Sequence, residues 1–203
     1  MKTNKIIAIS IVLIIPLLFY LYFEFKKQKE GVRIKELPFL SQDSIPSFSF
    51  IDQKGKTFNS KDLEGKIAVI DFFFTTCPGI CIKLTGQMQR LQDFIFTHPN
   101  LKSDYKLVSF TVDPETDSVG QLAEYAIEKN VDYEKWKLLT GEKDSIYNLA
   151  TEFFKLPAID LGTDTLPEPF VHSERFVLLD KKGKIRGYYD GTDTSSVNEM
   201  MKD

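Results

Sequence analysis

The chain has 203 residues, of which 42% are hydrophobic and 27% are charged. Its length allows one domain of ordinary size with an appendage, and its composition excludes a disordered, collagen-like or disulfide-dense protein. The formal net charge of −3 provides no basic excess for binding a phosphate backbone, and two cysteines with two histidines exclude a multi-zinc module.

The first predicted element is an uncharged apolar segment from Ile6 to Phe23. As a helix it is about 27 Å long, close to the thickness of the hydrocarbon core of a bilayer. It ends in aromatic residues without a small-residue cleavage site, which favours an uncleaved anchor over a cleaved secretory signal. We predict a cytoplasmic N-terminus over residues 1–5, a transmembrane helix over residues 6–25 and a charged tether over residues 26–40. Lysines flank the helix on both sides, so the charges alone leave its orientation open.

Residues 41–203 are predicted to form one domain. Polar and apolar residues alternate around the turn sequence Asp52–Gly55, which predicts a β-hairpin over residues 47–58. A nearly continuous apolar run from Ile67 to Phe74 is typical of a central strand that is covered by helices on both faces.

Helices and strands alternate after this central strand. The predicted elements, in chain order, are a helix over residues 84–95 that ends at 98–100, a strand over 105–112, a helix around 119–126, a short strand over 136–139, a helix around 146–154, a hairpin over 176–189 and a closing helix from 195. Strands that alternate with helices and then form a hairpin predict an α/β fold with a central mixed sheet flanked by helices.

Both cysteines stand just past the carboxyl end of the predicted central strand, where a helix begins and where open α/β sheets place their sites. Cys77 and Cys81 are four residues apart, so they share one helical face at a separation close to that of a disulfide. Because the N–H groups of a helix N-terminus favour negative charge, we expect lowered thiol pKa values. The alternative is a pair of buried structural cysteines, although a disulfide that closes so short a loop adds little stability.

The cysteine pair has the chemistry of a copper site. Two thiolates do not complete a tetrahedral zinc site, but a pair of soft sulfur ligands suits Cu(I), and one imidazole would add a third ligand. His98 is about 25 Å away at the far end of the helix that the cysteines begin, so it is excluded. His172 lies in a proline-bracketed loop before the terminal hairpin and is the candidate ligand; the alternative is a loop histidine without this role.

The chain resembles the Sco/SenC family of membrane-tethered, thioredoxin-like copper proteins. The motifs that carry the resemblance, besides the N-terminal apolar segment, are FSFIDQKG at 48–55, LEGK at 63–66, TTCPGIC at 75–81, TVDPE at 111–115 and FVHS at 170–173. The resemblance implies a thioredoxin-like fold on the extracytoplasmic (periplasmic) side of the membrane and copper bound by Cys77, Cys81 and His172. It also implies delivery of copper to the binuclear copper site of cytochrome c oxidase. Asp113 matches a family position, and an Asp-Pro turn is its alternative role.

Three positions depart from the pattern that family members often show. Ile82 replaces a proline after the second cysteine, Gly79 replaces an acidic residue between the cysteines, and Val171 replaces an aspartate before the histidine. The candidate ligands are retained, but the sequence predicts fewer carboxylates to orient them.

The resulting hypothesis is a copper chaperone. Its dithiol form would take up copper and pass it to an acceptor subunit of a terminal oxidase, while a disulfide between Cys77 and Cys81 would be inactive. A copper donor and a thiol reductant are further expected partners. One alternative is a membrane-anchored thiol-disulfide oxidoreductase that uses the same thiols without metal, although its commoner spacing is C-x-x-C. The other is a redox sensor or peroxide-reducing protein that acts through a sulfenate.

Overall fold

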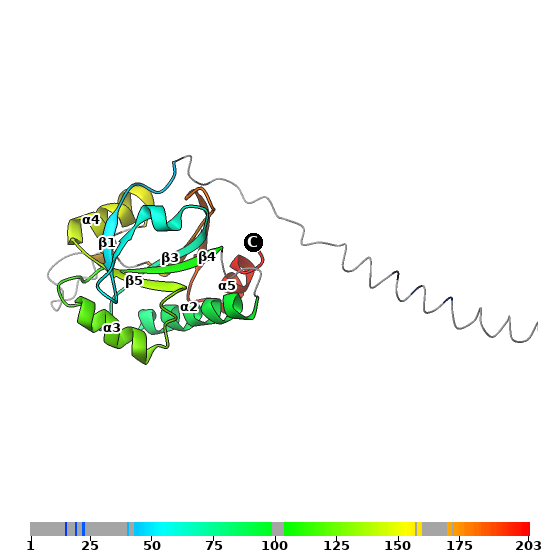
Figure 1. Cartoon of the computed structure of the whole chain (residues 1–203), viewed down its shortest axis with the longest axis horizontal. Coiled ribbons are helices and arrows are strands. Elements are labelled where there is room, and N and C mark those ends of the chain that lie inside the picture. Colours follow the sequence, from blue (N-terminus) through cyan, green and yellow to red (C-terminus); the bar gives the residue numbers. More distant parts are fainter. Residues whose placement is uncertain are drawn as a thin grey trace, which may run out of the picture. The chain divides into compact units, whose positions relative to one another are not determined.

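The computed structural model describes residues 43–98, 104–156 and 173–203, together with residues 15, 19, 22, 40, 158–159 and 170–171 (Figure 1). The chain divides into two compact units, Met1–Glu36 and Leu37–Asp203. In the first unit the described residues Ile15, Phe19 and Tyr22 are helical and exposed. The rest of the predicted anchor, and the predicted tether apart from Leu40, lie outside the described residues. Among the residues that are described, no helix is long and apolar enough to span a bilayer.

A seven-stranded mixed sheet forms the centre of the second unit. Its strands are β1 (Ser49–Asp52), β2 (Thr57–Asn59), β3 (Ile67–Phe73), β4 (Tyr105–Thr111), β5 (Trp136–Thr140), β8 (Arg175–Leu179) and β9 (Ile185–Asp190). They lie side by side in the order β2-β1-β5-β4-β3-β8-β9. The three inner strands β5, β4 and β3 are parallel, whereas the hairpins β1–β2 and β8–β9 join them in antiparallel register.

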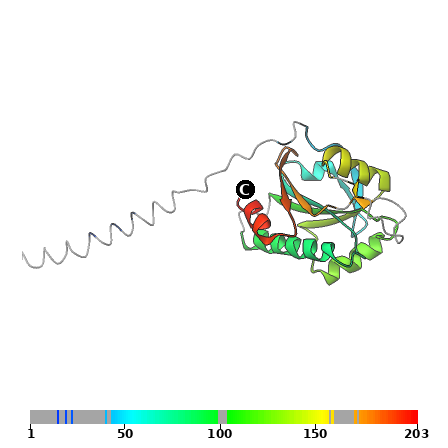
Figure 2. The same cartoon turned by 180° about the vertical axis from the view of Figure 1, so that it is seen from behind.

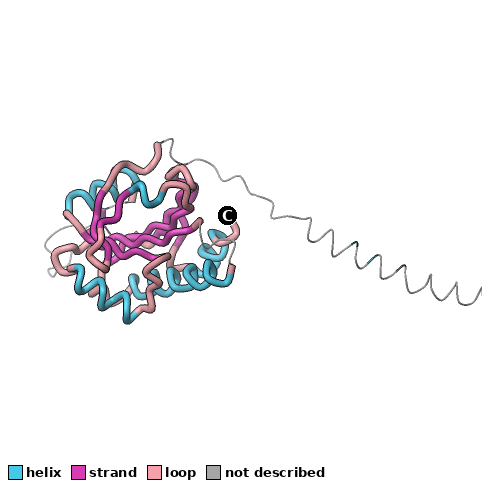
Figure 3. Tube along the Cα trace, viewed as in Figure 1, coloured by secondary structure: helices cyan, strands magenta, loops and turns pink. Residues whose placement is uncertain are grey.

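Helices cover both faces of this sheet (Figures 1 and 2). On one face lie α2 (Ile80–Thr97), α3 (Val119–Glu128) and α5 (Thr194–Met200). On the other face lie the 3-10 helix η1 (Ser60–Leu63), α4 (Lys143–Asn148) and the π-helix η3 (Leu149–Phe153). The tube in Figure 3 shows the strands enclosed between these two helical layers.

The alternation of side chains along the strands produces two separate cores. In β3, Ile70 and Phe72 pack toward α4 and η3, whereas Val69 and Phe73 pack toward α2 and α3. The apolar run that predicts β3 is continuous because both faces of this strand are buried.

The predicted N-terminal hairpin is confirmed, with Phe50 of β1 opposite Phe58 of β2. Its turn is closed by the Asp52 side chain, whose Oδ1 accepts the backbone N–H groups of Lys54 and Lys56 at 2.9 Å each. Gly55 adopts φ = 73°, a left-handed conformation that glycine tolerates best.

A second, two-stranded sheet pairs β6 (Ala158–Ile159) with β7 (Phe170–Val171) in antiparallel register. The sequence pattern predicts neither of these short strands. His172 follows β7 directly and lies outside the described residues, as do residues 160–169.

The mixed sheet with flanking helices agrees with the predicted fold, and each predicted helix and strand of the domain is present. The predicted helix around 146–154 differs in form, because it begins at Lys143 and widens into a π-helix over Leu149–Phe153. The backbone N–H of Phe154 accordingly donates to the carbonyl of Leu149, five residues earlier.

Candidate metal centre

Cys77 and Cys81 lie where β3 ends and α2 begins. The last residue of β3, Phe73, is paired with the last residue of β4, Thr111, and Val112 N–H donates to the Phe73 carbonyl at 2.9 Å. A short loop from Phe74 to Gly79 then leads into α2. The cysteines therefore stand at the carboxyl edge of the parallel strands, as the sequence predicts.

The two cysteines contact one another through the first turn of α2. The backbone N–H of Cys81 donates to the Cys77 sulfur, with 3.4 Å between N and Sγ. Gly79 is the N-cap residue and has no side chain to accept a helix N–H. The Cys77 sulfur therefore takes the place of a capping oxygen. It accepts one of the N–H groups that have no partner within the first turn of α2.

Both cysteines are free thiols and are largely buried, with exposed fractions of 9% for Cys77 and 3% for Cys81. Burial is the main cause that raises the pKa of the Cys81 thiol, and the adjacent Cys77 and the more distant Asp71 raise it further. The expectation of a lowered thiol pKa is therefore wrong for Cys81, because desolvation by burial outweighs the backbone hydrogen bond at Phe74, which lowers the pKa. A metal that binds this sulfur must displace its proton.

Several buried polar side chains lie on the same face of the sheet as the two cysteines. The Ser109 hydroxyl donates to the Asp71 carboxyl group, and the Trp136 indole N–H donates to Ser109 Oγ at 2.8 Å. Burial raises the pKa of Asp71 to about 7. On α2 and α3, Thr85 and Tyr125 share a hydrogen bond of 2.7 Å between their hydroxyl groups.

A carboxylate that no sequence motif indicates is hydrogen-bonded to the cysteine loop. Asp117 is fully buried and accepts hydrogen bonds from the backbone N–H and the hydroxyl of Thr75 and from the hydroxyl of Thr111. Asp113, which the resemblance singles out, instead forms a turn, and its carbonyl accepts the backbone N–H of Asp117 at 2.8 Å. The prediction of few carboxylates around the site is thus incomplete.

The two histidines have different positions. His98 is exposed at the end of α2, where its Nδ1 lies 2.8 Å from the Phe94 carbonyl oxygen and its ring contacts the Phe94 ring. Its predicted separation from the cysteines is confirmed. His172 is outside the described residues, so its predicted role as a ligand stays a prediction.

The residue after His172 reaches the cysteine site. Ser173 is buried and, together with Cys81, lines a cavity of about 10 Å³ beneath the loop. The other lining residues are Phe72, Phe73, Phe74, Ile80, Leu84 and Val112. β8 is antiparallel to β3, with Val177 opposite Ile70, so the chain before β8 approaches the end of β3 that carries the cysteines.

The described residues contain no group of three or more His, Cys, Asp or Glu side chains placed to hold one metal ion. Cys77 and Cys81 supply two soft donors, which fit copper by their chemistry but leave a coordination position for a third ligand.

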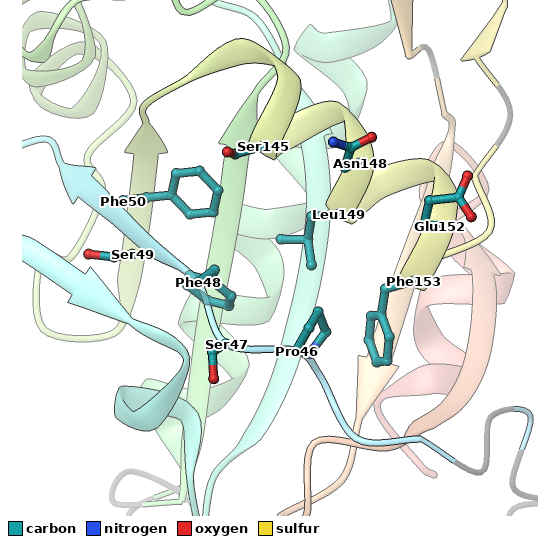
Figure 4. Close-up of a pocket in the computed structure, with 10 residues that line it drawn as sticks. All are labelled: Pro46, Ser47, Phe48, Ser49, Phe50, Ser145, Asn148, Leu149, Glu152 and Phe153. Atoms are coloured by element: carbon teal, nitrogen blue, oxygen red, sulfur yellow. The ribbon is translucent and has the colours of Figure 1, made fainter.

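A larger pocket of about 570 Å³ opens on the opposite face of the sheet (Figure 4). Residues of α4 and η3, such as Asn148 and Phe153, line it on one side, and the segment from Pro46 to Phe50 lines it on the other. It holds no cysteine or histidine, so it is not a candidate for the metal chemistry considered above.

Comparison with known proteins connects this geometry to one family. The sequence profile of the SCO1/SenC family matches residues 40–203. A SCO1/SenC family lipoprotein from Bacillus anthracis str. Ames is 31% identical, with a TM-score of 0.68 over 79% of this chain and 92% of its own.

Two further structures are similar. BsSco, a member of the Sco family of cytochrome c oxidase assembly proteins in which a disulfide switch has been identified, is 29% identical, with a TM-score of 0.68 over 84% of this chain and 94% of its own. Arabidopsis thaliana ScoI, whose structure has copper bound, is 26% identical, with a TM-score of 0.63 over 78% of this chain and 94% of its own.

Proposed function

Since this chain belongs to the SCO1/SenC family and has its thioredoxin-like fold, we propose that it is a copper chaperone for the assembly of cytochrome c oxidase. The observation that carries the proposal is the pair of free thiols at the start of α2. The N–H group of Cys81 contacts the Cys77 sulfur, so both sulfurs lie within one helical turn. A soft, closely spaced thiol pair suits Cu(I) better than it suits zinc or a hard cation.

His172 is the proposed third ligand. Ser173, the residue that follows His172 in the sequence, lines a cavity that Cys81 also lines. This neighbour in the sequence supports His172 as the ligand. An imidazole would complete a three-coordinate site that accommodates copper in either oxidation state. Because copper is the cargo, an incompletely coordinated ion favours its transfer to an acceptor by ligand exchange.

The protein's own groups define the loading step. Copper takes the place of the thiol protons, and the raised pKa of Cys81 makes this exchange a competition between metal and proton. To form a disulfide, the Cys77 and Cys81 thiols would give two protons and two electrons to the disulfide of a partner, which would become a dithiol. The oxidised protein would then have no thiolate to bind the metal. Reduction therefore precedes loading.

The test is an anaerobic Cu(I) titration of the full-length chain in detergent, in competition with a chromophoric chelator. One copper ion is expected to bind the reduced protein, with binding lost in the Cys77→Ser/Cys81→Ser variant and weakened in His172→Ala. His98→Ala is the matched control and should bind as the wild type does, because His98 is exposed at the other end of α2. Equal binding by the wild type and the double cysteine variant would refute the proposal.

We further propose that residues 6–25 anchor the protein in the membrane and place the domain on the extracytoplasmic side. The uncharged sequence from Ile6 to Phe23 supports an anchor, and the similar Bacillus anthracis protein is described as a lipoprotein. Labelling of intact cells with a membrane-impermeant reagent should modify the domain. Labelling that requires cell lysis would contradict this orientation.

The proposed acceptor is the subunit of the oxidase that carries its binuclear copper site, and a copper donor and a thiol reductant complete the set of partners. Deletion of the gene should lower the copper content of purified oxidase. An oxidase with its full copper complement in the deletion strain would count against this partner.

A second candidate function is thiol-disulfide exchange with the cysteines of the oxidase subunit. The contact between Cys81 N–H and Cys77 Sγ favours it, as does the disulfide switch described for BsSco. The two functions differ in their need for His172, because a reductase without metal should retain full thiol-exchange activity in His172→Ala. Loss of copper delivery with unchanged thiol exchange in this variant would assign the chaperone role.

A further inference from the structure

We propose that Asp117 is a positioning residue for the cysteine loop, and that its buried carboxylate sets the geometry with which Cys77 is presented to copper. This inference rests on the proposed function for its copper readout. It also has a readout in the metal-free protein.

Asp117 connects two chain segments that are distant in sequence. It lies after β4, one residue before the α3 N-cap Ser118, and has an exposed fraction of 0%. Its Oδ2 and Oδ1 accept the Thr75 backbone N–H at 3.1 and 3.3 Å, and its oxygens also accept the hydroxyl groups of Thr75 and Thr111.

Asp117 is itself held firmly. Its backbone N–H donates to the Asp113 carbonyl at 2.8 Å, and the Asp113 N–H donates to Thr111 Oγ1 at 3.0 Å. These bonds fix the turn to the end of β4. Because the carboxylate is fixed in this way, it holds Thr75, two residues before Cys77, at a defined position relative to the central sheet.

The rest of the loop is weakly held. Cys77 N–H donates to the Phe74 carbonyl at a long 3.4 Å, and Gly79 provides no side-chain cap for α2. Within the described residues, the side chains of the segment from Thr75 to Gly79 make two hydrogen-bonded links to the rest of the fold: Thr75 donates to Asp117, and the Cys77 sulfur accepts the Cys81 N–H of α2 at a long 3.4 Å. Only the link through Asp117 ties the loop to the segment that follows β4. Removing this carboxylate should therefore free Cys77 more than it disturbs β3 or α2.

The chain offers a matched control for the loss of a buried carboxylate. Asp52 is buried like Asp117, and its carboxylate likewise accepts backbone N–H and hydroxyl groups, here those of Lys54, Lys56 and Tyr133, but it closes the N-terminal hairpin. Asp52→Asn should destabilise the fold to a similar degree without touching the cysteine loop. Thr76→Val is the control for the loop itself, because Thr76 is exposed and neighbours the bonded Thr75.

The first measurement is Cu(I) affinity of the full-length reduced protein. Asp117→Asn is expected to weaken binding by about 10-fold or more, the range found when groups that orient metal ligands are removed. Thr75→Val, which removes one of the donors, should weaken binding by about 5-fold. Because both variants break the same link, the double variant should be weaker by less than the product of the two effects.

The second measurement is the rate at which iodoacetamide alkylates Cys77 in the metal-free protein, read by mass spectrometry. Asp117→Asn and Thr75→Val should alkylate Cys77 several-fold faster than the wild type, whereas Asp52→Asn and Thr76→Val should not. If Asp117→Asn does not fold, Thr75→Val alone decides the comparison.

The inference is overturned if Asp117→Asn binds copper and alkylates like the wild type, or if Asp52→Asn weakens copper binding equally. A wild-type protein that binds no copper would refute the proposed function only, since the alkylation rates would still test whether Asp117 positions Cys77.

Discussion

At the scale of single residues, Asp71 is the least expected group of the site. It interrupts the apolar run of β3 with a carboxyl group that has an exposed fraction of 2% and whose pKa is raised to about 7 by burial. Its hydrogen-bond partners, Ser109 and through it Trp136, are neutral, so they do not compensate an ionised carboxylate with a positive charge.

This environment makes stability depend on pH. The pKa of Asp71 in the folded state lies above its unfolded value of 3.8. The neutral form is therefore favoured by folding, and its contribution is fully present below pH 3.8 and is lost as the pH rises toward about 7. At 1.36 kcal/mol per pKa unit, the loss is about 4 kcal/mol at most.

Asp71→Asn should remove this loss, because asparagine stays neutral and its carbonyl still accepts the Ser109 hydroxyl. The variant should be more stable than the wild type at pH 8 and similar at pH 4, as measured by urea unfolding. The exposed Glu64→Gln is the control and should leave the pH profile unchanged. A wild-type stability that stays constant between pH 4 and 8 would contradict a raised pKa of Asp71 in the folded state. A loss of stability that persists in Asp71→Asn would assign it to another group.

The sequence predicts the cysteines but neither Asp71 nor Asp117, for physical reasons. The thiol pair is recognised locally, because four residues span one helical turn. Asp117 acts through Thr75, which is 42 positions away in the sequence and comes close only when β3 and β4 pair in parallel. Its nearest sequence signal, the Asp-Pro turn at Asp113, points to a different aspartate.

At the scale of elements, hydrophobic periodicity is sufficient to predict a helix when one face of that helix packs on the sheet. It predicts α2 because Leu84, Met88, Leu91 and Ile95 all face the core. It does not predict the π-helix over Leu149–Phe153, since apolar residues at helical spacing fit either geometry, nor the two-residue strands β6 and β7, which carry too few residues for a pattern.

The turn between β9 and α5 packs closely against α2. Gly191 donates its N–H to the Glu174 carbonyl at 2.7 Å and leaves no room for a side chain. A Cβ atom there would lie 2.6 Å from Leu84 Cδ2, 2.8 Å from Phe176 Cε1 and 3.0 Å from the Glu174 carbonyl oxygen. Gly191→Ala should therefore destabilise the fold by about 1–3 kcal/mol in urea unfolding.

Gly120 is the matched control for this substitution. It lies in α3, where the nearest atom to an added Cβ is Ser118 Oγ at 3.8 Å. Gly120→Ala should leave stability unchanged or raise it by up to about 1 kcal/mol, because alanine favours a helix. Equal stability of the two alanine variants would contradict the close packing at Gly191.

At the scale of the whole molecule, the mixed sheet brings two distant parts of the chain to the edge where the cysteines lie. One part is the segment of β3 and β4, and the other is the C-terminal hairpin β8–β9. β3 and β4 carry Cys77 and Asp117 at their carboxyl ends, while β8, antiparallel to β3, brings Ser173 to the same edge from the C-terminal hairpin. Copper bound by Cys77, Cys81 and His172 would link the two parts, and these ligands can meet only in the folded state. Copper binding and folding should therefore be coupled.

This coupling should appear as a thermal stabilisation of the protein by copper. An ion that binds the folded chain alone stabilises it by about 4 kcal/mol when its free concentration is 1,000 times the dissociation constant. For a domain of this size, that corresponds to a rise in Tm of about 10 °C. Differential scanning calorimetry under anaerobic conditions should show this rise for the reduced wild type with Cu(I), a smaller rise for His172→Ala and none for Cys77→Ser/Cys81→Ser. A rise of equal size in the double cysteine variant would mean that copper binds elsewhere in the molecule, because that variant has lost both soft donors of the site.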